Sequence, residues 1–309
     1  MELIAAIEGS GYFPFKFMYL GEQGVRNWIT VANERMKEKG AINYVEGQLF
    51  RSKIPELLNS FGKVKGLNLI DIGCGDGIPV LPILNELKKR RIPFTYAPMD
   101  ISREMADTAI RNVTKEVGKC VTHPIIADYE RGNFSDIAFD LEENGYTNLL
   151  LFLGSTIGNP ADIGRALSNF KESMTSRNFM IVGAQQSNLN RIDKLLLHYK
   201  TDAVANFVTY LLPSIGIKRR DVGVTASWND ALCRIEMHLV MKRDVEAKIM
   251  GSKIFIEQGE KLLVVHSKKF TAATFTDLFL KIGFRTELLT TDANNSYILS
   301  MVQPSRHTA

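Results

Sequence analysis

The sequence predicts an α/β protein in which a parallel sheet flanked by helices is combined with a second, discontinuous α+β domain. Short apolar runs alternate with helical patterns over residues 66–183, which is the order of strands and crossover helices in a parallel sheet. The runs lack polar alternation, as is typical of strands buried on both faces. Residues 226–266 differ, because alternating and β-branched stretches joined by turns indicate antiparallel strands there.

The expected elements follow in chain order. Helices are expected near the N-terminus at 24–37 and 48–61. The repeating region predicts strands at 67–72, 94–99, 123–127, 148–153 and 179–183. Helices are expected between them at 79–90, 102–117 and 162–174. Beyond the last of these strands we expect one long helix at 190–212, antiparallel strands within 226–240 and 253–266, a helix at 274–282, and a strand at 296–302 that would suit a return to the parallel sheet.

Composition excludes several classes of protein. The chain has 309 residues, of which 45% are hydrophobic and 23% charged, as in ordinary globular proteins. A net charge of +4 is too small for a dedicated nucleic-acid binder. Cys74, Cys120 and Cys233 are far apart and form no CxxC spacing, so neither a disulfide framework nor a metal site is expected. No apolar run is long enough to span a membrane, and the N-terminus is a poor signal peptide, so we expect a cytoplasmic protein with no membrane partner.

A glycine-rich segment after the first expected strand is the most informative motif. Residues 71–77 read DIGCGDG. Glycine permits positive φ and a close approach of the backbone to a ligand, and ligands of such sheets lie beyond the carboxyl ends of the strands. The dinucleotide fingerprint G-x-G-x-x-G does not fit, because residue 78 is isoleucine. The residues expected to contact a cofactor here are Asp71, Gly73, Cys74, Gly75 and Gly77.

Acidic residues end the next two expected strands. Asp100, followed by Ile101, can accept both hydrogen bonds of a ribose diol. Asp128 can accept from an adenine amino group, and Tyr129 can stack on the ring. Either aspartate could instead be a helix N-cap. The ordered set resembles S-adenosylmethionine (SAM)-dependent methyltransferases, which implies SAM as cofactor and S-adenosylhomocysteine (SAH) as product; another Rossmann-like enzyme with a different nucleotide is the alternative.

A narrower resemblance rests on the end of the fourth expected strand. Residues 152–159 read FLGSTIGN, which is similar to a signature of the histidine Nα-methyltransferase family of ergothioneine biosynthesis. Other segments resemble the same family's motifs: 44–50 (YVEGQLF), 96–102 (YAPMDIS), 226–237 (AxW and IEM) and 259–270 (GE and SxKF). The resemblance therefore covers about residues 44–302.

This resemblance implies a domain organisation and a set of site residues. It implies a Rossmann-like SAM-binding domain at 62–190 and 270–309, and a substrate-binding lid at 1–61 and 191–269. Tyr44 and Gly154 would lie at the cofactor, with Gly154 also beside the amine. Asn159 and Tyr199 would bind the carboxylate and amine of an amino-acid substrate and position it for catalysis. Asn159 could instead be a turn residue before proline, and Tyr199 a core aromatic.

One departure from the family concerns the substrate side chain. The histidine enzymes place a glutamate two residues before the serine of SxKF, where this chain has Val265 before Ser267. Alternation puts these two side chains on one face and His266 on the other. We therefore expect N-methylation of a small amino-acid-like metabolite other than histidine, with no dedicated base because the proton can leave to water. The alternatives are O- or S-methylation of another metabolite, or a non-catalytic cofactor-binding member.

Overall fold

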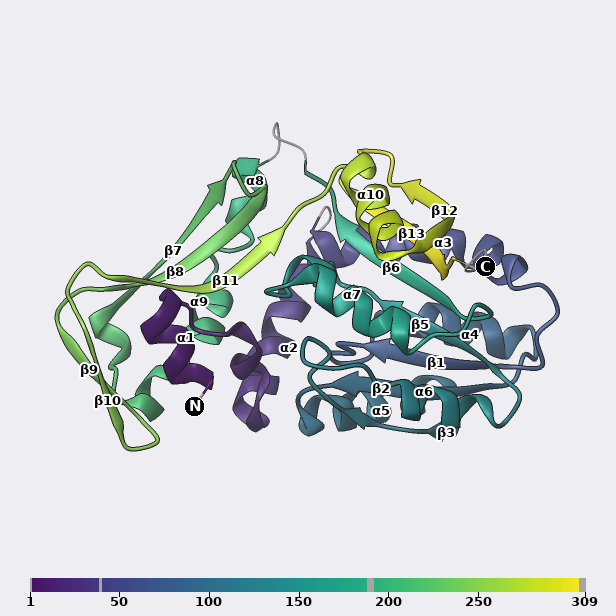
Figure 1. The fold of residues 1–309 in the computed structure, drawn as a ribbon, viewed down its shortest axis with the longest axis horizontal. Coiled ribbons are helices and arrows are strands. Elements are labelled where there is room, and N and C mark those ends of the chain that lie inside the picture. Colours follow the sequence, from purple (N-terminus) through teal and green to yellow (C-terminus); the bar gives the residue numbers. More distant parts are fainter. Residues whose placement is uncertain (1, 39–40, 188–191, 306–309) are drawn as a thin grey trace. The chain divides into compact units, whose positions relative to one another are not determined.

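A computed structural model describes residues 2–38, 41–187 and 192–305 (Figure 1). The chain forms two compact units, which we call the sheet unit (Arg35–Ser187 and Phe270–Ala309) and the second unit (Met1–Glu34 and Asn188–Lys269). The expected division at 61/62 differs from the observed one at 34/35. Helix α3 (Ile42–Ser60) belongs to the sheet unit, because its apolar face packs into the same core as the strands. Of the other two expected divisions, the one at 269/270 coincides with a boundary of the two units, and the one at 190/191 lies outside the described residues.

The sheet unit contains one sheet, in the order β12-β13-β6-β5-β1-β2-β3, with β4 also beside β2. Strands β1, β2, β5 and β6 are parallel and almost fully buried, as their apolar runs predict. Their bounds are Leu67–Ile72, Phe94–Asp100, Thr147–Phe152 and Phe179–Gln185. The chain runs from β1 outward to β2 and β3, and then returns to β5 and β6 on the other side of β1. The switch point of this doubly wound sheet therefore lies between β1 and β5.

Helices cover both faces of this sheet (Figure 1). Leu149 and Leu151 of β5 face the core formed with α3, α4 (Leu81–Lys89) and α5 (Arg103–Val117). Leu150 and Phe152 of the same strand face the opposite core, as the period of two in a strand requires. The helices on that side are α6 (Ser135–Glu142), α7 (Ile163–Glu172) and α10 (Ala272–Ile282).

In the sheet unit, one expected strand is divided into two and one further strand was not expected. The expected strand at 123–127 is replaced by two two-residue strands, β3 (Val121–Thr122) and β4 (Ile125–Ile126). The last strand, β13 (Tyr297–Pro304), returns to the sheet, but it runs antiparallel to β6. It does so because an unpredicted strand, β12 (Phe284–Thr291), starts directly after α10 and pairs with β13 as a hairpin. Gly283, at φ +92°, ends α10 and allows this tight change of direction.

The second unit contains a three-stranded antiparallel sheet in the order β11-β8-β7 and a β9-β10 hairpin. The strands are β7 (Val222–Asn229), β8 (Arg234–Met241), β9 (Val245–Ile249), β10 (Ser252–Ile256) and β11 (Lys261–Lys268). The unit's helical segments are α1 (Glu2–Ser10), most of α2 (Gly21–Lys37), α8 (Ile192–Leu197), α9 (Asp202–Thr209) and the 3-10 turns Phe15–Tyr19, Leu212–Ile215 and Arg219–Asp221.

The long helix expected at 190–212 is broken. Its first two residues lie outside the described residues, and the rest forms α8, α9 and a 3-10 turn. Thr201 is the physical reason, because its side chain accepts a hydrogen bond from the N–H of Val204 and caps a new helix there. Tyr199 therefore lies in the short connection between α8 and α9 rather than on a helix.

Among the helices that the structure describes, none combines the length and the apolar character that a membrane crossing requires.

Candidate active site

The glycine loop after β1 has a backbone that only glycine adopts readily at three positions. Gly73, Gly75 and Gly77 have φ of +62°, +54° and +72°. The N–H of Cys74 donates to the carbonyl of Met99 (3.1 Å), which fixes the loop against the end of β2. Burial raises the pKa of the Cys74 thiol well above its ordinary value, so this sulfur is not a reactive nucleophile.

Gly77 has a different role from the other loop glycines. A Cβ at Gly77 would lie 3.0 Å from the Cα of Ala109 on α5. At Gly73, a Cβ would lie 3.4 Å from Cγ2 of Thr156 and 3.9 Å from the ring of Tyr129, which are ordinary contact distances. Gly77 is therefore needed for packing against α5, whereas Gly73 lies where the loops after β1 and β5 adjoin.

Two buried aspartates lie beside this loop. Asp100 is 7% exposed, and its Oδ1 accepts from the N–H of Ser102 at 3.0 Å. Burial raises the pKa of Asp100 to about 6, against the opposing effect of backbone N–H groups. Asp71 accepts from the hydroxyl of Tyr96 at 2.8 Å, and burial raises its pKa to about 7. Burial makes the charged form of both carboxyls costly. The site therefore suits a ligand that donates hydrogen bonds from hydroxyl groups or carries positive charge.

The residues after β4 complete the same edge of the sheet. Asp128 accepts from the N–H of Glu130 at 3.1 Å and lies 3.5 Å from Nε of Arg131. The ring of Tyr129 packs edge-on against Phe152, with centroids 5.6 Å apart. Its position beside Gly73 agrees with the expectation that it borders the cofactor. Ile101 and Tyr44 are half-buried, the first directly after Asp100 and the second on α3.

The FLGSTIGN segment forms a tight loop at the end of β5. Gly154 has φ +73°, and Ser155 has φ +58°, which is unusual for a residue with a side chain. Ser155 Oγ holds this conformation by accepting from the N–H of Gln185 at 2.8 Å, at the end of β6. Asn159 ends the 3-10 turn Thr156–Gly158 and is half-buried. The loop thus lies at the switch point, next to the glycine loop.

Glu46 on α3 is a site residue that the sequence analysis missed. The backbone N–H of Gly154 lies 3.0 Å from its Oε1 and 2.8 Å from its Oε2. Burial raises its pKa to about 8, and the charge of Asp71 adds to the shift. The sequence could have identified Glu46, because it lies on the apolar face of α3 with Leu49 and Phe50, where a carboxylate is unexpected.

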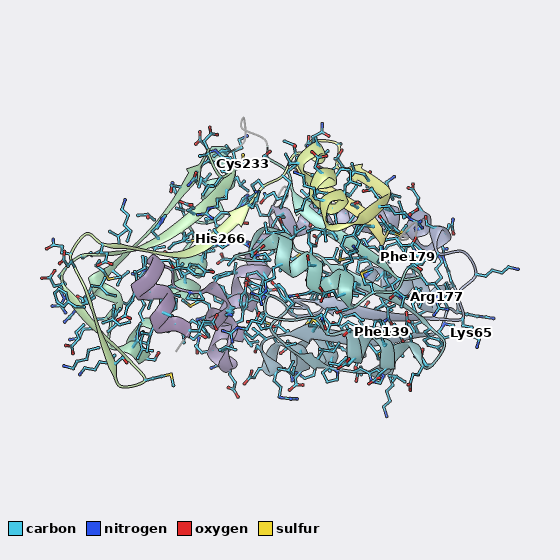
Figure 2. The ribbon with its side chains drawn as sticks, in the orientation of Figure 1. Lys65, Phe139, Arg177, Phe179, Cys233 and His266 are labelled. Atoms are coloured by element: carbon cyan, nitrogen blue, oxygen red, sulfur yellow. The ribbon has the colours of Figure 1, made fainter. Side chains whose placement is uncertain are left out.

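In the second unit, the strand pairing settles which side chains share a face. Val265 pairs with Met237 and Ser267 with Ile235, so all four lie on one buried face of the sheet. His266 lies on β11 (Figure 2). It pairs with Glu236 of β8, and by alternation this pair occupies the opposite face of the sheet. A bulge lies between Leu263 and Val265, but the pairing of residues 265–267 stays in register, and His266 is buried on its own face of the sheet, where its ring packs against Tyr12. The alternation used in the sequence analysis therefore describes this strand correctly.

Lys269 joins two of these residues and was also missed as a site residue. Its ammonium donates to Ser267 Oγ at 2.8 Å and to the Tyr199 hydroxyl at 3.2 Å, and it lies 5.6 Å from the centre of the Tyr199 ring. Its side chain is only 2% exposed. Alternation could have found it, because residues 265, 267 and 269 are expected on the same face.

The structure thus groups the expected site residues by unit. The sheet unit brings together eight of the residues that were expected to contact a cofactor: Asp71, Gly73, Cys74, Gly75, Asp100, Asp128, Tyr129 and Gly154. Asn159 belongs to the sheet unit, whereas Tyr199, Val265 and Ser267 belong to the second unit. Among the described residues, no three His, Cys, Asp or Glu side chains are arranged to hold a metal ion.

The sheet-unit residues fit an adenosyl ligand. The glycine backbone is open at Gly73, Asp100 can accept from a ribose diol, and Tyr129 presents an aromatic ring beside the loop. The buried carboxyls of Asp71 and Glu46 suit a ligand with positive charge, such as a sulfonium.

Comparison with solved structures shows the same fold in two methyltransferase domains. The CMeT domain of the citrinin polyketide synthase (12% identity, 92% of this chain, 57% of that chain) and the CurJ carbon methyltransferase (10% identity, 92% and 60%) both superpose with a TM-score of 0.50. The magnesium protoporphyrin IX methyltransferase from Synechocystis PCC 6803, with bound SAH, has 12% identity, covers 93% of this chain and 97% of its own, and has a TM-score of 0.49.

A comparison with curated proteins gives no significant match. Residues 42–304, however, match the profile of a family described as histidine-specific, SAM-dependent methyltransferases. This match extends over both units and includes the glycine loop, FLGSTIGN and β11. The chain belongs to that family and is a SAM-dependent methyltransferase.

Proposed function

We propose that this enzyme transfers a methyl group from SAM to the amine nitrogen of a small amino-acid-like metabolite other than histidine. The sheet unit would hold SAM, with Asp100 on the ribose, Asp128 and Tyr129 at the adenine, and the glycine loop beneath the donor. The second unit would recognise the substrate through Tyr199 and the buried face of β11. Tyr44, Ile101 and Cys74 would line the cofactor site.

The observation that carries the choice of substrate is the apolar environment of Val265. A histidine side chain needs a partner for its imidazole N–H groups, and the family's glutamate position is Val265 here. The cross-strand partners on this face, Met237 and Ile235, are apolar as well. Burying an imidazole against Val265, Met237 and Ile235 would leave the polar atoms that face them unpaired, which costs about 1–3 kcal/mol per group. An apolar side chain, in contrast, would gain from burial there.

The cluster of Tyr199, Ser267 and Lys269 supports an acidic group on the substrate. A buried ammonium that already orients two hydroxyl groups offers several donors in one place. Such a donor set suits a carboxylate, and charge-assisted hydrogen bonds are stronger than neutral ones. An amino acid supplies this carboxylate next to its amine.

The chemistry requires little from the protein beyond positioning. SAM supplies an activated methyl group on a sulfonium. The protein must hold a neutral amine about 3 Å from the methyl carbon, and orientation of this kind provides a large share of the rate enhancement. Asn159 offers both a donor and an acceptor with which to orient the amine. Gly154, whose backbone is exposed at the loop, leaves room for it.

A substrate panel tests this proposal directly. We expect amino acids with apolar side chains to release SAH at least about 10-fold faster than histidine at equal concentration, which corresponds to one lost hydrogen-bonding partner. Mass analysis of the product should locate the new methyl group on nitrogen. Efficient methylation of histidine, or a methyl group on oxygen or sulfur, would overturn the proposal.

A substitution at Val265 sharpens the test. Val265→Glu restores a carboxylate at the position that the family uses for imidazole, so we expect the ratio of histidine to apolar substrates to rise about 10-fold or more. Val265→Leu is the matched control, because it changes volume without adding a charge and should leave histidine a poor substrate. Equal effects of both variants on histidine would contradict the assigned role of Val265.

A further inference from the structure

The Glu46 carboxyl lies under the loop where the reacting nitrogen is expected. Both of its oxygens are within 3.0 Å of the backbone nitrogen of Gly154, yet Glu46 is only 3% exposed. The backbone N–H groups of Gly154 and Ser155 occupy two acceptor positions, whereas an ionised carboxylate has about four. The carboxylate therefore keeps unused acceptor capacity directly beneath the exposed backbone of Gly154.

Two features of the sheet leave space for this carboxyl. A Cβ at Gly183 of β6 would lie 2.6 Å from Glu46 Oε2, so only glycine fits beneath it. The hydroxyl of Tyr297 on β13 reaches the same point above Gly183. That hydroxyl is buried and makes no hydrogen bond within the described part of the chain. A buried hydroxyl without a hydrogen-bond partner is unusual in a protein interior.

The charged surroundings of Glu46 favour uptake of a proton. The titratable groups facing it are Asp71 at the end of β1 and the Tyr297 hydroxyl, and no cation is among the groups that shift its pKa. Desolvation and the neighbouring carboxyl both raise the pKa of Glu46, to about 8. General bases work best when their pKa lies near the working pH.

We propose that Glu46 is a catalytic residue that accepts the proton of the substrate ammonium and so generates the neutral amine for methyl transfer. This inference rests on the proposed N-methylation. It replaces the expectation that the proton leaves directly to water.

The proposed step is balanced in protons and electrons. An N–H proton of the ammonium moves to the Glu46 carboxylate, giving a carboxylic acid and a neutral amine. The nitrogen lone pair then forms a bond to the methyl carbon as the carbon–sulfur bond breaks, and that bond's electron pair stays on sulfur. The products are an N-methylammonium and SAH, and the Glu46 proton leaves to water before the next turnover.

The pH dependence of Glu46→Gln distinguishes a base from a structural contact. The glutamine carbonyl can still accept from Gly154 N–H, but it cannot take up a proton. We expect kcat/KM with the best amine substrate to fall about 100-fold near pH 7, a typical loss for a general base. At about pH 10, where much of the free amine is already neutral, the deficit should shrink to less than about 5-fold.

Controls distinguish a failure of the Glu46 proposal from a failure of the proposed N-methylation. SAH binding, measured by calorimetry, should be unchanged in Glu46→Gln, and Glu56→Gln on the exposed side of α3 should behave as wild type. A loss that is equal at every pH, or no loss at all, would overturn the proposal and leave N-methylation intact. A wild-type product methylated on oxygen or sulfur would instead overturn the proposed function itself, and the Glu46 assignment with it.

Discussion

Asp100 makes a contact within the fold in addition to the role that we propose for it at the cofactor. Its Oδ1 accepts from the N–H of Ser102, directly before α5. The N-cap of α5 is Ser102 rather than Asp100, so the N-capping alternative holds only in part. The N–H groups of Gly75 and Ile101 also interact with this carboxylate, but an ionised carboxylate has about four acceptor positions, so one is left for a ribose hydroxyl. Because the residue is buried, its charge is costly unless a ligand donates to it.

We therefore expect Asp100→Asn to weaken SAH binding about 100-fold in calorimetry, since hydrogen bonds to a charged acceptor contribute about 1.5–3 kcal/mol each. Asparagine keeps the volume and one acceptor, so the loop beside Ser102 should survive. Asp107→Asn, an exposed change on α5, is the control. An affinity of Asp100→Asn close to that of wild type would remove the ribose assignment.

The site residues that could be predicted from the sequence are those at strand ends. Asp71, Asp100 and Asp128 each follow an apolar run, so their common edge is determined by local pattern and the rules of parallel sheets. Glu46 and Lys269 were not predicted as site residues, because their roles depend on tertiary contacts. Glu46 contacts Gly154, and Lys269 contacts Tyr199, and in both pairs the two residues are far apart in the sequence.

At the scale of elements, the choice of residue in the glycine loop depends on its packing against α5 as well as on its own backbone conformation. The positive φ of Gly77 could be anticipated from the motif, but its contact with α5 could not. The same holds for the regular elements. Helices and buried strands with strong periodicity were predicted within a few residues, whereas the break before α9 depends on one capping threonine and β12 on a glycine-terminated helix.

This packing leads to a stability prediction for Gly77→Ala. The new Cβ would meet the α5 backbone at 3.0 Å and also impose φ +72° on an alanine. We expect a loss of about 2–4 kcal/mol in the free energy of unfolding, measured in urea, as the sum of left-handed strain and overpacking. Gly62→Ala, at φ +64° with open space around it, should lose only about 1 kcal/mol. Equal losses would show that packing against α5 contributes nothing.

At the scale of the whole molecule, the sheet unit concentrates buried acids at one edge. Glu46, Asp71 and Asp100 have pKa values raised to about 8, 7 and 6, and burial is the main cause for each. The unfolded chain would ionise the same groups near pH 4. Between about pH 4 and 8 the native state therefore holds more protons than the unfolded state, and its stability must fall as pH rises. A cationic cofactor would stabilise the ionised carboxylates and so reduce this loss of stability at higher pH.

Glu46→Gln isolates one part of this effect, because glutamine does not titrate. At pH 5 the native wild type carries a neutral Glu46, so the variant should differ little in its free energy of unfolding in urea. As pH rises to 8, the wild type should lose stability relative to the variant, by up to about 1.4 kcal/mol per pH unit. Glu56→Gln, which removes an exposed carboxyl from the same helix, should show no such trend. A parallel pH dependence of wild type and Glu46→Gln would mean that Glu46 is already ionised in the native protein at pH 5, and that its burial costs far less than the structure indicates.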